Sequence, residues 1–131
     1  MKNKIDLLYG DLTYKIRGAV FNVHKNLGSG QKESVYQKAL AVEFKKKIIR
    51  FKEEPALSVR YSGVNVGVYK PDFLIEGKII LEIKAVSFLI KNNFDQIKHY
   101  LMTTGYKLGL LINFGARRVQ IKRIIYEKAR I

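Results

Sequence analysis

The stretch Tyr69-Lys-Pro-Asp-Phe-Leu-Ile-Glu-Gly-Lys-Ile-Ile-Leu-Glu-Ile-Lys84 decides the fold of this chain of 131 residues. It is typical of two β-strands joined by a tight turn at Glu76-Gly77-Lys78. Apolar residues alternate along both strands, and successive side chains of a strand point to opposite faces of a sheet. The residues predicted to form one buried face are Phe73, Ile75, Ile79, Leu81 and Ile83.

The opposite face of this hairpin carries Asp72, Glu82 and Lys84. The two carboxylates share that face only if the numbers of paired residues sum to an even value, because side chains alternate along each strand. A two-residue Glu76-Gly77 loop gives an odd sum, whereas a three-residue loop, or a bulge with Gly77 at positive φ, gives an even one. We therefore predict the less common turn, with both acids and the lysine on one surface.

Two acids and a lysine on one surface indicate a particular chemistry. Adjacent carboxylates repel, which raises the pKa of one or both unless a positive charge lies between them. Magnesium is a hard cation that prefers oxygen ligands. A metal that positions water, next to a lysine that faces a phosphate, is suited to phosphodiester hydrolysis. The alternative is a half-exposed hairpin whose outer face carries ordinary charges.

Composition restricts the class of protein. The length suits a single domain over residues 1–131, and fractions of 47% hydrophobic and 27% charged residues are those of a globular protein. With no cysteine and only His24 and His99 as histidines, disulfides, zinc thiolates, thiol catalysis and histidine-rich metal sites are excluded. No apolar run suits a membrane span or a signal peptide, so we expect a soluble cytoplasmic protein without a membrane partner.

The chain is strongly basic, with 25 basic and 11 acidic residues and a net charge of +14. Such a surface attracts polyanions, and phosphate contacts gain from counterion release. Nucleic acid is the favoured partner, with an anionic membrane or plain solubility as the alternatives. Asp72 and Glu82 lie beside Lys70, Lys78 and Lys84. Carboxylates contribute to a phosphate-binding surface only if they hold a cation.

The other elements follow from apolar periodicity. Helices are predicted at about residues 11–27, 31–47 and in the later part of 88–104. Strands are predicted at residues 49–61 with a break near Pro55, then 66–75, 78–86, 108–114 and 119–126. Asp11 is the expected N-cap of the first helix, and Gly105 the expected stop of the third. The continuous apolar run at 108–114 predicts a central strand covered on both faces.

Four short motifs form a pattern that is more specific than any one of them: Gly30-Gln-Lys-Glu33-Ser-Val-Tyr36, Pro71-Asp72, Glu82-Ile83-Lys84 and Gln96-Ile-Lys-His-Tyr100. The first matches the motif that names the GxxExxY proteins, a group within the PD-(D/E)xK nuclease superfamily. The second and third match the signature of that superfamily, and the fourth resembles a helix of its helicase-associated nucleases. The chain resembles this group over roughly residues 10–125.

The resemblance implies an α/β (α+β) fold of the restriction-endonuclease-like type, a mixed sheet flanked by helices in the order α-β-β-β-α-β. It implies Glu33, Asp72 and Glu82 as an acidic cluster and Lys84 as the catalytic lysine. The metal would be Mg²⁺, with Mn²⁺ as a substitute, held by Asp72, Glu82, the Ile83 carbonyl and Glu33. Residues expected to support this site or to contact nucleic acid are Tyr36, Lys70, Gln96 and Tyr100.

Glu33 has two interpretations. It falls in the first turn of a predicted helix, where a carboxylate complements the helix dipole. It is also three residues from Tyr36 and so on the same side of the helix. That spacing would let the carboxylate reach a site while the tyrosine ring packs beneath it.

We therefore expect a magnesium-dependent phosphodiesterase that acts on nucleic acid, with DNA favoured over RNA and a homodimer left open. An alternative of a different class is a nucleic-acid-binding or accessory module of a repair or defence complex that keeps the fold but does not cut. The complete acidic set with Lys84 argues against that alternative.

Overall fold

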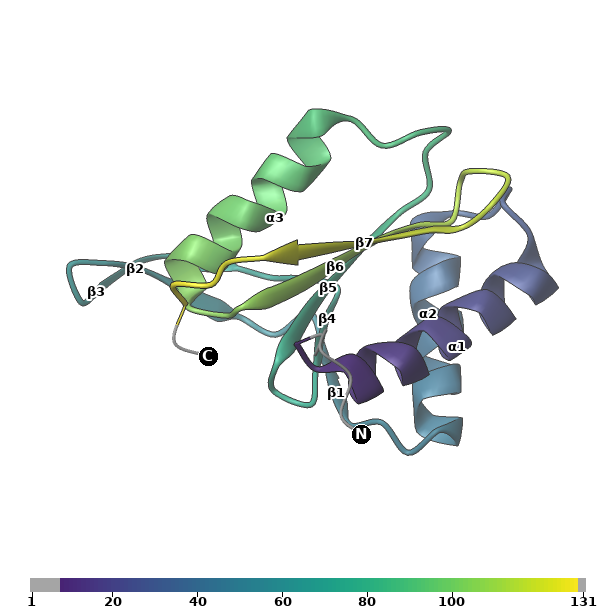
Figure 1. Ribbon diagram of the computed structural model, residues 1–131, viewed down its shortest axis with the longest axis horizontal. Coiled ribbons are helices and arrows are strands. Elements are labelled where there is room, and N and C mark those ends of the chain that lie inside the picture. Colours follow the sequence, from purple (N-terminus) through teal and green to yellow (C-terminus); the bar gives the residue numbers. More distant parts are fainter. Residues whose placement is uncertain (1–7, 130–131) are drawn as a thin grey trace, which may run out of the picture.

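The computed structural model describes residues 8–129. A five-stranded sheet lies at its centre, with α1 and α2 on one face and α3 on the other (Figure 1). The helices are α1 (Gly10–Leu27), α2 (Glu33–Lys46) and α3 (Lys91–Thr104). The strands of this sheet are β1 (Phe51–Glu53), β4 (Phe73–Ile75), β5 (Ile79–Lys84), β6 (Leu108–Asn113) and β7 (Gln120–Ile125). A separate hairpin consists of β2 (Leu57–Tyr61) and β3 (Val64–Tyr69).

The central sheet is mixed. Its strand order is β1-β4-β5-β6-β7, and β5 and β6 are parallel while the other neighbours are antiparallel. The series α2, β1, β4, β5, α3, β6 gives the order α-β-β-β-α-β. The predicted restriction-endonuclease-like architecture is therefore confirmed, with α1, the β2–β3 hairpin and β7 added to it.

Each face of the sheet has its own apolar core. The core beneath α1 and α2 includes all five residues predicted for the buried face of the hairpin, Phe73, Ile75, Ile79, Leu81 and Ile83. The core beneath α3 takes the alternate residues Leu74 and Ile80, together with Ile97 and Leu101 of the helix. Every residue of β6 is buried, which confirms the central strand covered on both faces.

The turn between β4 and β5 confirms the predicted register. Ile75 pairs with Ile79, an even sum, so the three residues 76–78 form the loop. Gly77 has φ of 65° as expected, and Glu76 also has a positive φ, of 51°. The register places Asp72, Glu82 and Lys84 on the α3 side of the sheet, alternating with the residues of the α1–α2 core.

The strand predicted at residues 66–75 is wrong as a single strand. β3 ends at Tyr69 and β4 begins at Phe73, and the two belong to different sheets. Pro71 lies in the break, because a proline has no N–H with which to continue a ladder. The predicted break near Pro55 is confirmed, and it separates β1 from β2 in the same way.

The helix ends differ in detail from the prediction. Asp11 is not the N-cap of α1: the cap is Tyr9, whose carbonyl accepts the N–H of Thr13 at 2.9 Å, and Asp11 lies in the first turn. Gly105 does end α3, in the left-handed conformation with φ of 90°. α2 begins at Glu33 rather than near residue 31.

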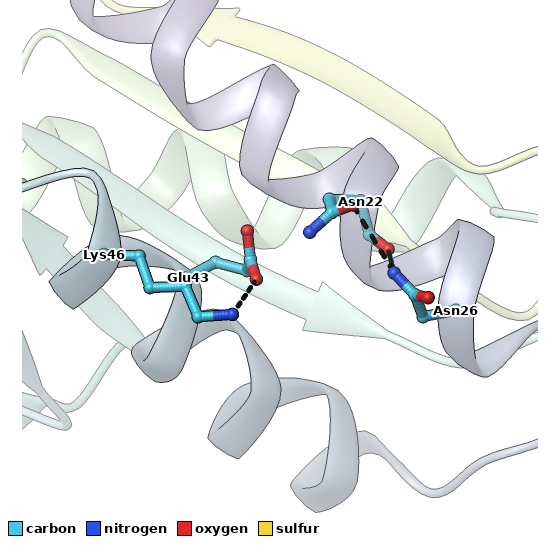
Figure 2. Close-up of polar contacts among 4 residues, drawn as sticks. All are labelled: Asn22, Asn26, Glu43 and Lys46. Atoms are coloured by element: carbon cyan, nitrogen blue, oxygen red, sulfur yellow. Dashed lines mark hydrogen bonds and ion pairs between the residues drawn. The ribbon is translucent and has the colours of Figure 1, made fainter.

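Figure 2 shows two polar pairs on α1 and α2, each formed within a single helix. Glu43, which is buried, forms an ion pair with Lys46 one turn further along α2, at 3.6 Å. On α1 the amide of Asn26 donates to the carbonyl oxygen of Asn22 at 2.8 Å. The buried charge of Glu43 thus has a partner on its own helix, and we do not count this acid among the site residues.

Candidate active site

The site is built on the β4–β5 hairpin, on the face of the sheet covered by α3. Phe73 pairs with Leu81, and extending this register by one residue sets Asp72 opposite Glu82. Lys84 follows Glu82 by one pleat on the same face. The structure therefore brings together three of the four residues that the sequence assigned to catalysis.

Asp72 is held by the strand opposite to it. Its Oδ2 accepts the backbone N–H of Ile83 at 2.6 Å. Burial raises the pKa of the Asp72 carboxyl, and the hydrogen bond from Ile83 and the positive charge of Lys84 oppose this rise. The hydrogen bond fixes the carboxylate beside the strand that carries the second acid.

Glu82 is the more strongly perturbed acid. Burial raises the pKa of its carboxyl to about 7, and the charge of Asp72 adds to this rise. The hydroxyl of Tyr69 donates a hydrogen bond to Glu82 Oε2 and, with Lys84, offsets part of the rise. Burial and the nearby Glu82 charge raise the pKa of Tyr69, so that its hydroxyl keeps the proton it donates.

Tyr69 is a site residue that the sequence reasoning missed. It is the last residue of β3 and is only 5% exposed. Its ring stacks on that of Tyr100 of α3, with centroids 3.7 Å apart and planes 5° apart. Tyr100, which was expected to support the site, therefore packs against the residue that holds Glu82. The available signal was the position of Tyr69 just before the proline break, but its contact with Glu82 depends on where the β2–β3 hairpin lies.

Two further predicted residues lie at the surface. Lys70 is exposed in the break between β3 and β4, two residues before Asp72. Gln96 is exposed on α3, one turn before Tyr100. Both remain candidates for contact with a ligand that approaches from solvent.

Glu33 and Tyr36 are not gathered with the acid pair. Glu33 is exposed at the first turn of α2, the helix that packs on the other face of the sheet. Within residues 8–129, no three side chains of His, Cys, Asp or Glu lie close enough together to hold a metal ion. Tyr36 is fully buried, and its hydroxyl donates to the Gly28 carbonyl at 2.6 Å and accepts the Gln31 N–H at 3.1 Å. The hydroxyl thus closes the loop between α1 and α2 and makes no hydrogen bond to Glu33.

The donor set fits a hard divalent cation. Asp72 and Glu82 present carboxylate oxygens at one place, and burial makes their combined negative charge unfavourable without a cation. Mg²⁺ is usually bound by one or two carboxylates, with water and substrate phosphate as the remaining ligands. Two protein acids are therefore sufficient for this ion, and a third is not required.

The comparison with protein families shows the superfamily of the chain. A family model described as the PD-(D/E)XK nuclease superfamily matches residues 10–124, and the chain belongs to this superfamily. Its members are generally nucleases that act on nucleic acid and use divalent metals. No curated protein and no solved structure is significantly similar to the chain.

In the part of the chain that the structure describes, no helix is both long enough and apolar enough to cross a membrane.

Proposed function

We propose that this chain is a magnesium-dependent nuclease of the GxxExxY group that hydrolyses phosphodiester bonds in DNA. The observation that carries the proposal is the half-buried pair of Asp72 and Glu82, with Lys84 one pleat along from Glu82 on the same strand. A half-buried pair of acids in a chain of net charge +14 is expected at a site that binds a cation together with a polyanion.

Each residue of the pair has a defined role in this proposal. Asp72 and Glu82 would hold Mg²⁺, with the Ile83 carbonyl as a third protein oxygen. The bound ion would supply electrostatic stabilisation of the phosphate and a water of lowered pKa. Tyr69 keeps Glu82 in place, and the Ile83 N–H does the same for Asp72. Lys84 carries a positive charge and three N–H donors that can contact phosphate oxygens or orient the attacking water.

A cleavage panel tests the proposal. Single-stranded, duplex and branched DNA, with RNA versions of each, are incubated with Mg²⁺, Mn²⁺ or EDTA. We expect cleavage of DNA with either metal and none in EDTA. Asp72→Ala and Glu82→Ala should each abolish cleavage, whereas Asp95→Asn, which changes a partly exposed acid of α3 that pairs with Lys91, should not. Wild-type rates in either alanine variant would contradict the assignment, and binding of the panel without any cleavage would support the accessory-module alternative.

The role of Glu33 rests on the motif alone and needs its own test. If Glu33 only complements the helix dipole, Glu33→Gln should lower the free energy of unfolding by up to about 1 kcal/mol and leave cleavage unchanged. If it takes part in the reaction, the change should leave stability near wild type and reduce cleavage by about tenfold or more. In that case Mn²⁺ should restore part of the loss, because it accepts a less complete ligand set.

A further inference from the structure

The loop at residues 85–90 leads from β5, which ends at Lys84, to α3 (Figure 1). It follows the candidate site directly in the chain and carries exposed apolar side chains. Phe88 is 71% exposed, Ile90 54% and Val86 37%. Single exposed apolar residues are normal on protein surfaces and need no explanation. Three exposed apolar residues in one short loop next to β5 are less usual, and they suggest that the loop contacts a ligand or partner.

The start of the loop is fixed to β6. The Asn113 side chain, which is fully buried, accepts the N–H of Val86 at 3.0 Å and donates to its carbonyl at 2.9 Å. Gly115 packs directly on the same segment, since a Cβ there would lie 2.3 Å from the Val86 nitrogen. The Phe114 N–H donates to the Lys84 carbonyl at 2.8 Å. The loop therefore leaves the site in one defined direction.

The far end of the loop is fixed to α3. Leu89 packs against the core beneath that helix. The Ile90 N–H donates to Asn93 Oδ1 at 2.9 Å, and the Asn93 N–H donates to the Ile90 carbonyl at 3.0 Å. Phe88 lies between these two anchored ends with its ring in solvent. A ring presented on an ordered loop loses little conformational entropy when it binds a ligand.

The sequence next to Phe88 carries no uncompensated negative charge that would repel an anionic ligand. Residues 85–94 contain no acid and include Lys91, and the next acid, Asp95, is paired with Lys91 at 2.7 Å. Phe88 follows Lys84 by four residues, so their Cα atoms are at most about 14 Å apart. A nucleic-acid strand with a phosphate at Lys84 would thus have a base within reach of Phe88.

We propose that Phe88 stacks on an unpaired base next to the cut phosphate, so that the preferred substrate is single-stranded or has a single-stranded segment at the site. This inference rests on the proposed function. An aromatic ring can stack on any base because every base has a π-face. In a duplex both faces of a base are already stacked, and exposing one costs unstacking energy. Stacking on the Phe88 ring therefore favours unpaired bases and does not depend on the base sequence.

The test measures binding rather than cleavage. Fluorescence anisotropy in EDTA compares a labelled single-stranded DNA oligonucleotide with a blunt duplex of the same sequence. Phe88→Ala should weaken single-strand binding by about tenfold or more and leave duplex binding unchanged. Phe88→Tyr should keep wild-type affinity, whereas Phe88→Leu, which retains apolar surface without a ring, should lose it. Tyr14→Ala, at an exposed aromatic of α1, is the matched control and should have no effect.

Other outcomes separate this inference from the proposed function. If the wild type binds single strands and Phe88→Ala binds them equally well, stacking is refuted and the nuclease proposal stands. If Phe88→Leu keeps wild-type affinity, the contact is apolar rather than stacked, and the inference is also refuted. A wild-type dimer that Phe88→Ala converts to a monomer in light scattering would assign the loop to a protein contact instead. If the wild type neither binds nor cleaves any nucleic acid, both proposals fail together.

Discussion

At the scale of single residues, the candidate site depends on how two half-buried carboxylates are stabilised beside each other. Asp72 is stabilised by the N–H of Ile83, and Glu82 by the hydroxyl of Tyr69. Lys84 supplies the positive charge near both. These groups orient the proposed ligands before a cation binds, and such outer contacts commonly control metal affinity.

The first prediction concerns the hydroxyl of Tyr69. Tyr69→Phe keeps the ring that stacks on Tyr100 but removes the hydrogen bond to Glu82. Mn²⁺ affinity in a direct titration should fall by about tenfold or more, because Glu82 is less well held and more readily protonated. The free energy of unfolding in EDTA should fall by about 1 kcal/mol. Tyr61→Phe, at an exposed tyrosine of β2, is the control, and unchanged Mn²⁺ affinity in Tyr69→Phe would contradict the assigned role.

The second prediction concerns pH. The pKa of Glu82 is raised from 4.5 to about 7, so the folded state binds this proton more tightly than the unfolded state does. The stability gained from this group is fully present below the unfolded pKa and is lost as the pH rises through the folded one. In EDTA, the melting temperature of the wild type minus that of Glu82→Gln should therefore fall as the pH is raised from about 5 to about 8. Taking the difference between the two melting temperatures cancels the contribution of acids that both proteins share. One of these is Glu76, whose pKa is lowered by its hydrogen bond from Arg50. A constant or rising difference would show that Glu82 does not titrate in this way.

At the scale of elements, the ends of the parallel strands β5 and β6 organise the site. β5 carries Glu82 and Lys84, and Asn113 at the end of β6 pairs in register with Lys84. Residues 113–115 bind the segment that follows Lys84 through hydrogen bonds and close packing. The position of the lysine and of the loop after it therefore depends on a neighbouring strand that comes later in the chain.

The third prediction tests this close packing. In Gly115→Ala the new Cβ would lie 2.3 to 2.5 Å from backbone atoms of Ala85 and Val86, which cannot rotate away as a side chain can. Urea unfolding should show a loss of about 1–3 kcal/mol or more. Gly30→Ala is the control, because nothing lies within 4 Å of its Cβ position. Equal stability of the Gly115→Ala protein and the wild type would mean that the loop moves freely away from β6.

At the scale of the whole molecule, charge governs the encounter with a substrate. The chain has a net charge of +14, whereas Asp72 and Glu82 make the candidate site locally acidic. The protein as a whole therefore attracts a polyanion at long range, but the two carboxylates repel its phosphates at close range. A divalent cation held by Asp72 and Glu82, as proposed, would reduce this conflict where the substrate phosphate would lie.

The fourth prediction follows from that charge. The logarithm of the binding constant for duplex DNA should fall linearly with the logarithm of salt concentration, with a slope of about −3 or steeper. Affinity should change little when the sequence is scrambled, because phosphate contacts carry no sequence information. A flat dependence on salt would contradict an electrostatic mode of binding.

The sequence by itself determined the hairpin and most of the elements around it. Alternation along residues 73–83 predicted the face beneath α1 and α2, and the need for an even register predicted the three-residue turn. These features depend on side-chain periodicity and turn geometry, which are local properties of a chain. The shared face of Asp72 and Glu82 followed from the same local rule.

Tertiary structure alone decided which distant residues join that pair. Tyr69 reaches Glu82 because the strand is interrupted at Pro71 and β3 belongs to a different sheet from β4. The sequence predicted one continuous strand there, and that prediction gave no reason to expect this contact. Asn113 binds Val86 across 27 residues of sequence, and the hydroxyl of Tyr36 closes a loop instead of serving Glu33. Each of these contacts joins separate elements, and their relative positions are set by how the two cores pack against the sheet, which no local pattern in the chain records.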